Sequence, residues 1–331
     1  MHIPDGYLSP STCAAFYALS GSAWWVALRK IKRLLMTRAI PLISVFAAFS
    51  FVIMMFNLPL PGGTTAHAVG IAVAAIVLGP WGAMLALSIA LAIQALLFGD
   101  GGITTLGANC FNMAVVGSLV AAGIYRLIAG DSTDGARRRV IAAAIAGYVS
   151  INAAAFLAAV EFGIQPKLFH DASGTPLFAP YPLHVAIPAM MIGHLTVAGI
   201  AEAVLSGGMI AYLQSTNSAL LRGIVPVSPG VTPARSERRL WVTVALLMLL
   251  TPLGTLAVGT AWGEWSADSF AKAPSGLARL SSIWTAPFPS YAPGFIKSPT
   301  FGYLLSAMFG VGVLVVISLV ARAMGRKELR P

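Results

Sequence analysis

Charged residues are what this sequence has least of. Asp, Glu, Lys and Arg together make up 10% of its 331 residues, whereas a soluble domain carries about 25%. Hydrophobic residues make up 57%. Because so few charges cannot give a globular surface its polar covering, the composition predicts a membrane protein.

Several chemical signatures are also missing. The two cysteines, Cys13 and Cys110, are too few for a disulfide framework and form no CxxC pair. No HExxH motif is present, which argues against an intramembrane metalloprotease, and no GxxxxGKS or GxxxxGKT loop is present, so we do not expect the chain to hydrolyse ATP. The opening MHIPDGYLSP lacks the parts of a secretory signal. We therefore expect Met1 and its free amine to be retained.

Apolar runs, in contrast, are abundant. Nine such segments lie at roughly 11–28, 39–58, 66–79, 81–98, 108–129, 138–160, 183–213, 240–260 and 302–322. A helix of about 20 residues crosses a bilayer core, and a helix satisfies its own backbone hydrogen bonds. The alternating pattern of a membrane barrel is absent. The sequence therefore predicts an all-α integral membrane protein, in which the segment at 66–79 is short and partly irregular.

The basic residues are distributed unevenly between the links of these segments. If the nine segments alternate in direction, 17 of the 21 Lys and Arg residues fall on one side, within 29–38, 126–139, 222–239 and 322–330. The other side keeps Lys167, Lys272, Arg279 and Lys297. The positive-inside rule then places the N-terminus outside and the C-terminus in the cytoplasm. The net charge of +10 is thus explained by membrane topology, and we expect no nucleic-acid partner.

A Pro-, Ser- and Gly-rich basic stretch divides the apolar segments into two groups. Residues 216–239 are predicted to form a cytoplasmic linker. Residues 1–215 before it hold seven closely spaced segments, and residues 240–331 after it hold two segments around an outer loop at roughly 261–301. We expect a seven-helix core followed by a two-helix appendage.

The outer side of this topology brings together groups that bind metals. The Met1 amine, the deprotonated backbone nitrogen of His2 and the His2 imidazole can chelate one ion in adjacent rings. His67 lies in the outer link NLPLPGGTTAHAVG and would complete a set of four nitrogens. Planar nitrogen sites suit Ni(II) or Cu(II), and imidazole suits late first-row metals in general. The opposing interpretation is that His2 is an ordinary polar terminus and His67 a solvated loop residue.

Four stretches, in their order, resemble a known family: MHIPDGYLSP, PLPGGTTAHAVG, LGPWGAMLALSIALAIQALLFGDGG and ITTLGANCFNMAVVG. They are similar to the substrate-capture subunits of energy-coupling factor transporters for cobalt and nickel, the CbiM/NikM family. The resemblance covers roughly residues 1–215. It implies a seven-helix core whose N-terminus inserts inward, with metal ligands at Met1, His2 and His67, all three of which are present.

The resemblance also implies a setting for this core. Such a subunit captures Ni²⁺ or Co²⁺ as its transported ion, carries no prosthetic group, and lies in a bacterial or archaeal cytoplasmic membrane. Its partners would be a transmembrane coupling subunit and ATPase subunits. The appendage, with SSIWTAPFPSYAPGF before its last segment, resembles the small NikN/CbiN-type component thought to help load the metal. Its usual acidic Gly-Leu-Glu element is poorly kept, with Arg279 where an acid is expected. A purely structural helix pair is the opposing interpretation.

Other polar residues are expected to support the site or the fold. Metal-bound imidazoles usually donate their second N–H to a neighbouring polar group, and Asp100 and Asn109 in the glycine-rich loop are candidates for that role. Asp5 is expected to position the inserted N-terminus. His184, His194 and Glu202 lie in one apolar segment, where ionisable residues are functional candidates. We interpret these three as structural, and expect His170 in an outer loop to be solvated.

Two alternatives remain open at this point. A planar nitrogen site favours nickel, but low-spin cobalt also accepts it, so uptake of cobalt for cobalamin biosynthesis is the second interpretation. A membrane metal sensor without transport is less favoured, because the longest inner link is only about 26 residues and provides no output domain.

Overall fold

The computed structural model describes residues 1–331 with the exception of 36–38, 61–62, 131–134, 217–220, 222–232 and 329–331. The described chain is helical apart from loops and one short antiparallel strand pair. The predicted all-α class is therefore confirmed.

The helical and strand elements follow one another along the chain in a simple order. They are α1 (Pro10–Leu35), α2 (Ala39–Met54), β1 (Leu58–Leu60), β2 (Thr64–Ala66), α3 (Ile71–Ile93), η1 (Gln94–Phe98), α4 (Leu106–Asn109), η2 (Cys110–Val116), α5 (Gly117–Ala129), α6 (Ala136–Leu168), α7 (Leu183–Gly193), η3 (His194–Ala198), α8 (Gly199–Thr216), α9 (Pro233–Leu250), η5 (Thr251–Leu256), η6 (Ala267–Ser269), α10 (Ser275–Leu280), η7 (Pro289–Tyr291) and α11 (Pro299–Glu328). The elements η1, η2 and η3 are π-helical and continue the α-helices beside them.

Six helical stretches of the described chain are long and apolar enough to cross a membrane. They are Ile71–Phe98, Leu106–Ala129, Ala136–Leu168, Leu183–Thr216, Arg238–Leu256 and Pro299–Ala321. Helix α2 is also apolar but shorter, at Ile40–Met54. The protein is thus a multi-pass membrane protein, as its composition predicted.

The first of these stretches is not a single straight crossing. A straight helix of its 28 residues would be about 42 Å long, yet both of its ends reach His2. The ring of His67, before α3, stacks on the ring of His2, and Asp100, after η1, lies 3.0 Å from His2 Nδ1. The chain therefore turns back inside α3, at Gly79, whose φ of 71° and ψ of 165° are not helical. The predicted segments 66–79 and 81–98 are the two limbs on either side of this turn.

A buried carboxylate holds the beginning of α3 inside the bundle. Glu202 of α8 is fully buried, and its two oxygens accept the backbone N–H groups of Val69, Gly70 and Ile71 at 2.7–2.9 Å. The N–H groups of a first helical turn have no partner within the helix, and a negative charge there also interacts well with the helix dipole. Glu202 is thus a capping residue for α3, which agrees with a structural role.

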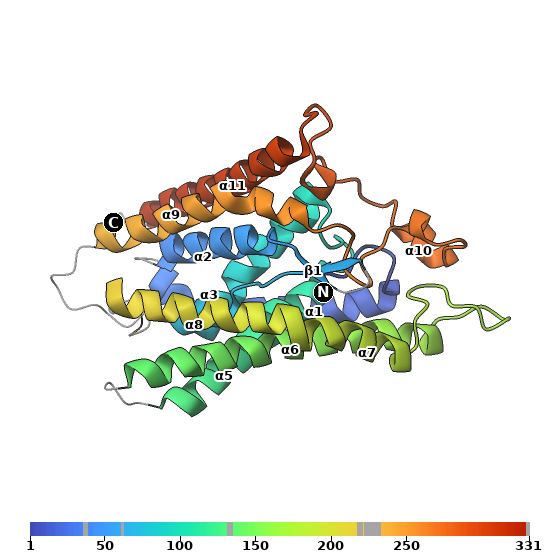
Figure 1. Cartoon of the computed structure of the whole chain (residues 1–331), viewed down its shortest axis with the longest axis horizontal. Helices are drawn as coiled ribbons and strands as arrows, with labels where there is room; N and C mark the ends of the chain where they lie inside the picture. Colours follow the sequence, from blue (N-terminus) through green and yellow to red (C-terminus); the bar gives the residue numbers. More distant parts are fainter. Residues whose placement is uncertain (36–38, 61–62, 131–134, 217–220, 222–232, 329–331) are drawn as a thin grey trace.

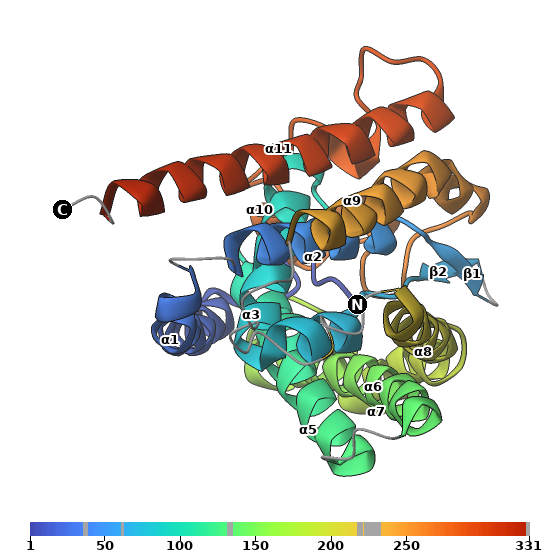
Figure 2. The ribbon, with the colours of Figure 1, turned by 90° about the vertical axis from the view of Figure 1, so that its left-hand side faces the viewer.

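The C-terminal part lies along one side of the core. Helices α9 and α11 both pack against α2, and Figures 1 and 2 show them side by side above the other helices. The loop between them crosses over the region of the N-terminus before α11 begins. Most of the predicted linker 216–239 lies outside the described residues, since 217–220 and 222–232 belong to the undescribed part.

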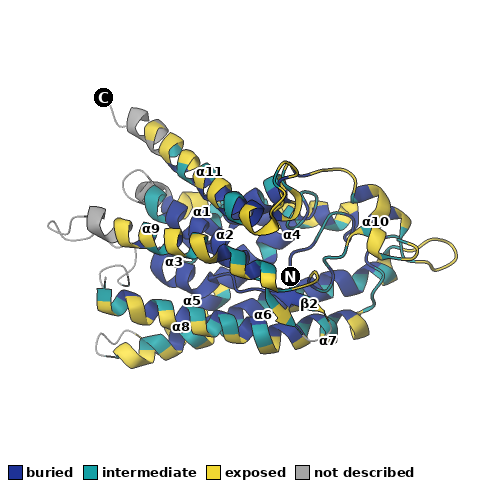
Figure 3. Cartoon of the chain, turned by 45° about the horizontal axis from the view of Figure 1, so that its top comes forward, coloured by how far each residue is buried: buried dark blue, intermediate teal, exposed yellow. Residues whose placement is uncertain are grey.

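The two ends of the bundle differ in what they carry. Figure 1 shows the ends of α5, α8 and α11 and the beginnings of α6 and α9 at one end, and α10 and the end of α6 at the other. The end of α5, with Arg126, and the beginning of α6, with Arg137, Arg138 and Arg139, therefore lie at the first end. The N-terminus lies near the middle of the long axis in Figure 1, and Figure 3 shows that much of α2, α3 and α6 is buried.

Candidate metal centre

The first three residues are inside the protein. Met1, His2 and Ile3 are 3%, 1% and 0% exposed. The backbone of Ile3 is held on both sides, since its N–H donates to Asn109 Oδ1 at 2.8 Å and its carbonyl accepts Asn109 Nδ2 at 3.1 Å and the Gly102 N–H at 2.9 Å. Asn109 thus fixes the inserted backbone at Ile3. The hydrogen bonds of the Asn109 side chain in the described part of the chain go to Ile3 and not to a histidine ring.

Asp5 holds the next turn of the N-terminal segment. Its carboxylate accepts the backbone N–H groups of Ile103 and Thr104 at 3.1 and 2.7 Å, and also the Thr104 hydroxyl. The chain at Gly102 passes so close that a Cβ there would lie 2.3 Å from the Asp5 nitrogen and 2.4 Å from Asp5 Oδ1. Only glycine permits this approach. The positions of Asp5 and of the glycine-rich loop are therefore mutually dependent.

His2 and His67 lie face to face. Their ring centroids are 5.0 Å apart, with 27° between the planes. His67 follows β2 and is 6% exposed. Its Nδ1 is 3.0 Å from the Ala68 carbonyl oxygen, so Nδ1–H is the donor. Its Nε2 is buried without a hydrogen-bond partner among the described residues. Burial lowers the pKa of His67 to about 4, so the ring is neutral near pH 7 and Nε2 carries a free lone pair.

Asp100 faces His2 with one carboxylate oxygen and accepts two hydrogen bonds with the other. Its Oδ1 lies 3.0 Å from His2 Nδ1, and its Oδ2 accepts the Tyr291 hydroxyl at 2.5 Å and Gln94 Nε2 at 3.2 Å. Burial alone would raise the pKa of this carboxyl group, but the charge and hydrogen bond of His2 outweigh it and hold the pKa below its usual range. Asp100 is therefore a carboxylate, and its Oδ1 faces the His2 ring.

Glu264 in the loop between α9 and α11 contacts the N-terminus itself. Its Oε1 accepts a hydrogen bond from the Met1 amine at 2.9 Å and from the backbone N–H of His2 at 2.9 Å. Tyr291, from the same part of the chain, supplies the hydroxyl on Asp100. The sequence pattern predicts a site role for neither residue. Tyr291 does lie in the SSIWTAPFPSYAPGF stretch, but nothing in that stretch relates it to position 100.

The appendage loop is also anchored beside the N-terminal segment by its backbone. The Tyr7 hydroxyl donates to the Trp265 carbonyl at 2.8 Å. Gly6 has φ +91°, and a Cβ there would lie 2.5 Å from the Leu277 carbonyl oxygen. The MHIPDGYLSP segment is thus enclosed between the glycine-rich loop on one side and the appendage loop on the other.

The arrangement supplies four nitrogens but few metal-binding side chains. In the described part of the chain, no group of three or more His, Cys, Asp and Glu side chains is arranged to hold a metal ion. Such a group is not needed here, because the predicted set uses the terminal amine and a backbone nitrogen beside two imidazoles. Two of the four donors, the amine and the His2 nitrogen, share the partner Glu264.

The remaining sequence candidates lie elsewhere. His184 is exposed on α7, and His170 is exposed in the loop after α6, as predicted. His194 is buried at the beginning of η3, where its Nδ1 lies 2.9 Å from the Met190 carbonyl oxygen, and it lines a cavity that also reaches Met1. Among the described residues, no hydrogen bond or ring contact joins any of these three histidines to His2 or His67.

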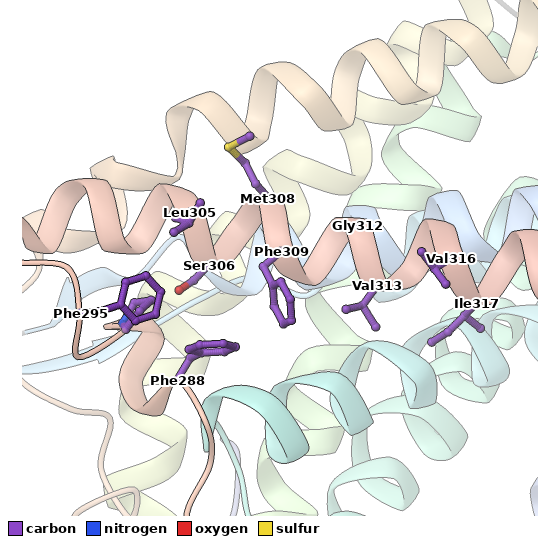
Figure 4. A pocket seen from close by; sticks show the side chains of 11 residues that line it. Phe288, Phe295, Leu305, Ser306, Met308, Phe309, Gly312, Val313, Val316 and Ile317 are labelled. Atoms are coloured by element: carbon purple, nitrogen blue, oxygen red, sulfur yellow. The ribbon is translucent and has the colours of Figure 1, made fainter.

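A separate hollow of about 600 Å³ lies beside α11. Figure 4 shows Phe288, Phe295 and Phe309 at one end of it and Val313, Val316 and Ile317 along α11. Ser306 is the one hydroxyl among its lining residues, and it donates to the Tyr291 carbonyl. The other side chains that line this hollow are apolar, and none of the predicted metal ligands Met1, His2 and His67 is among its lining residues.

Comparisons with known proteins identify the family. The pattern of the cobalt uptake substrate-specific transmembrane region, CbiM, matches residues 2–220. The chain is 52% identical to the fused nickel transport protein NikMN of Rhodobacter capsulatus over 99% of each protein. It is 41% identical to the probable fused nickel transport protein LarMN of Lactiplantibacillus plantarum over 96% of each.

A solved structure agrees with this assignment. The crystal structure of a truncated transition metal transporter is 54% identical and superposes with a TM-score of 0.61, covering 65% of this chain and 99% of its own. The fused relatives match the C-terminal helices as well, which is consistent with a NikN-like extension. The chain therefore belongs to the CbiM family of nickel and cobalt transport proteins, in the fused form that carries this extension.

Proposed function

We propose that this protein is the substrate-binding membrane subunit of an ATP-driven importer for Ni²⁺ or Co²⁺. The observation that carries the proposal is the buried N-terminus, where the Met1 amine and the stacked rings of His2 and His67 meet. Charged groups are costly to bury without a partner, and the amine of the buried Met1 is paired with Glu264 Oε1 at 2.9 Å, so the protein holds this terminus in place inside the fold. The names of the relatives, nickel transport proteins among them, support metal as the cargo.

The ligands of the ion would be four nitrogens. The Met1 amine, the His2 backbone nitrogen and the His2 imidazole belong to one short stretch of chain, so they close two fused chelate rings around a metal. His67 Nε2, which has a free lone pair and no partner among the described residues, would be the fourth donor. Imidazole and amine nitrogens suit nickel, cobalt and copper, and not Mg²⁺ or Ca²⁺.

The two nearby carboxylates hold this site in shape before the ion arrives. Glu264 accepts hydrogen bonds from the amine and the His2 N–H, and Asp100 faces His2 Nδ1. A bound metal replaces protons on its ligands, so the ion takes positions that N–H groups now occupy. We expect metal binding to release protons and therefore to weaken as the pH falls.

The three parts of the chain have different proposed roles. We propose residues 1–215 as the metal-capture core, 216–239 as a cytoplasmic linker and 240–331 as an appendage that assists loading. Glu264 and Tyr291 support a loading role, because both come from the appendage and both contact the N-terminal site.

Transport requires partners that this chain does not contain. The sequence has no ATP-binding loop of the Walker type, so we propose ATPase subunits and a membrane coupling subunit as partners and no enzymatic activity for the chain itself. The positive-inside rule supports an N-terminus outside and a C-terminus in the cytoplasm. Release to the cytoplasm then requires a second state with lower affinity, which the partners must stabilise.

Nickel is the favoured cargo, with cobalt as the second candidate. A planar nitrogen set suits Ni(II), and the two fused relatives compared above are named as nickel transport proteins. The family pattern, however, is named for cobalt uptake. Titration with both ions decides between them.

The test is calorimetric titration of the full chain, with its native N-terminus, by Ni²⁺ and Co²⁺. The variants are His2→Ala, His67→Ala and a chain with one extra residue before His2, and His184→Ala is the control because His184 is exposed on α7. We expect tight one-to-one binding in the native chain and the control, and none in the three variants. Unchanged binding in the extended chain would show that the Met1 amine is not a ligand.

A further inference from the structure

His194 lies close to the proposed metal site but is not one of its four proposed donors. His194 is 6% exposed and begins the π-helical turn η3 between two glycines, Gly193 and Gly199. Short π-helical turns are rare and often mark functional sites. An intramembrane ionisable residue is likewise a functional candidate. The geometry of His194 therefore needs an explanation beyond packing.

The hydrogen bonds of His194 leave one of its nitrogens free. Nδ1 is 2.9 Å from the Met190 carbonyl oxygen, so Nδ1 carries the proton and donates. Among the described residues, Nε2 has no hydrogen-bond partner. Unlike the unpaired Nε2 of His67, it is not fully enclosed. A neutral imidazole in this tautomer presents a lone pair at Nε2, which is the form that binds metals.

This free nitrogen belongs to a residue that lines a cavity reaching the N-terminus. The cavity has a volume of about 300 Å³. Met1, His194, the strand residues Thr64 and Thr65, and Trp262 of the appendage loop line it. Trp262 is two residues before Glu264, which binds the Met1 amine. Ile192 and Thr196 on its rim are exposed, whereas Met1 and His194 are buried. The cavity thus leads from the surface to the residue that carries the amine.

The volume of this cavity is large enough for a hydrated ion, and a few polar groups interrupt its mostly apolar lining. Six water molecules occupy roughly 180 Å³ at about 30 Å³ each, which is less than the cavity volume of about 300 Å³. The Thr64 and Thr65 hydroxyls and the His194 ring provide polar groups on its wall. Imidazole is a common ligand for late first-row metal ions and exchanges with water on them.

We propose that His194 is the first protein ligand of the incoming divalent metal ion, and that the cavity between η3, the β1–β2 strand pair and the appendage loop is the vestibule of the metal site. The ion exchanges one bound water for His194 Nε2 and then passes to the Met1 and His2 nitrogens. This inference rests on the proposed function. It assigns His194 a role in the rate of loading and none in the final bound state.

The experiment measures loading and release of Ni²⁺ in the full chain with its native N-terminus, by stopped-flow exchange with a fluorescent chelator. His194→Asn is the main variant, because its side-chain amide keeps a donor near the Nδ1 position but has nothing at Nε2. His194→Ala removes both groups. His184→Asn is the matched control, since His184 is exposed at the beginning of the same continuous helix.

We expect both His194 variants to load and release the ion roughly tenfold or more slowly, as loss of one stabilising interaction in the exchange step predicts, with unchanged stoichiometry and equilibrium affinity. The control should behave like the native chain. Native rates in His194→Asn would overturn the inference, because this variant has nothing at the Nε2 position. If His194→Ala alone were slow, the lost hydrogen bond to Met190 would explain the slow exchange. A large loss of affinity in both variants would also overturn it, since His194 would then belong to the final site.

A separate variant distinguishes failure of this inference from failure of the proposed function. His2→Ala must abolish the one-to-one site. If it does and the His194 variants keep native rates, only the vestibule is wrong. If His2→Ala still binds the ion, the proposed N-terminal site is wrong.

Discussion

Glu264 Oε1 lies 2.9 Å from the Met1 amine, although the two residues are 263 positions apart in the chain. Met1 is buried, and Glu264 is partly exposed in the loop that follows α9. The same carboxylate oxygen also accepts the His2 N–H. The C-terminal extension thus contacts two of the four proposed metal donors directly. It is therefore part of the environment of the site.

The first prediction concerns this contact. Glu264→Gln removes the negative charge that faces the Met1 amine while keeping the size of the side chain. Since a charged hydrogen bond to a buried partner is stronger than a neutral one, we expect the N-terminus to be released more often. An amine-selective reagent should then label Met1 several times faster than in the native chain, as measured by mass spectrometry.

The control for this prediction is Asp268→Asn, a change of the same kind at an exposed position four residues further along the loop. It should leave the labelling rate unchanged. Equal labelling of the native chain and the Glu264 variant would show that this carboxylate does not hold the terminus.

The second prediction concerns Tyr291. Tyr291→Phe removes the hydroxyl that donates to Asp100 but keeps the ring, which stacks on Phe98 at 4.8 Å. Partners of metal-ligating histidines typically contribute about 10- to 100-fold to metal affinity. We expect Ni²⁺ binding to weaken by about tenfold in a calorimetric titration.

Tyr303→Phe provides the comparison. The Tyr303 hydroxyl donates to the Met55 carbonyl at 2.7 Å and not to Asp100. Its loss should change stability and leave the affinity near the native value. A similar loss of affinity in both variants would mean that the effect spreads through packing, and not through Asp100.

The third prediction concerns Gly102. A Cβ at this position would lie 2.3 Å from the Asp5 nitrogen, a distance that real contacts do not show. Gly102→Ala should therefore displace the N-terminal segment and reduce Ni²⁺ affinity more than tenfold. Gly123→Ala on α5 is the control, because a Cβ there meets nothing within 4 Å. Native affinity in the Gly102 variant would contradict the tight packing of the loop against Asp5.

The fourth prediction tests whether Glu202 stabilises the fold without taking part in metal binding. Glu202→Gln leaves one carbonyl oxygen where two carboxylate oxygens now accept three N–H groups of the α3 beginning. Loss of a helix cap and of a charged acceptor costs about 1–3 kcal/mol of unfolding free energy. We expect a lower melting temperature in detergent, with the metal stoichiometry still one to one. A lost metal site with native stability would instead make Glu202 a ligand.

The membrane class and most of the apolar segments could be predicted from the sequence, and the N-terminal ligand set stays a prediction. Composition decides the class, because a chain with 10% charged residues cannot form a soluble surface. The short third segment was also predicted correctly as irregular, since PGGTTAHAVG contains turn-forming residues before the apolar run. Asp5 and Asp100 were predicted near the N-terminus, and the contacts of both agree with that expectation.

The contacts that complete the site could not be predicted in this way. Nothing in the local pattern around Glu264 or Tyr291 relates either residue to positions 2 or 100, because hydropathy and turn signals describe only neighbours in the chain. Glu202 appeared as an ionisable residue in an apolar helix, and only the position of α3 shows that it caps Ile71. His194 likewise appeared as one histidine among five.

The sequence by itself determined that this protein lies in a membrane and where most of its apolar helices run, and it placed an amine and an imidazole in its first two residues. These properties depend on residue type and on spacing along the chain. Only the tertiary structure decided that α3 turns back at Gly79, that the appendage loop reaches the Met1 amine, and that His194 lines a cavity leading to it. These relationships depend on how distant segments pack in space, and a one-dimensional pattern does not contain that information.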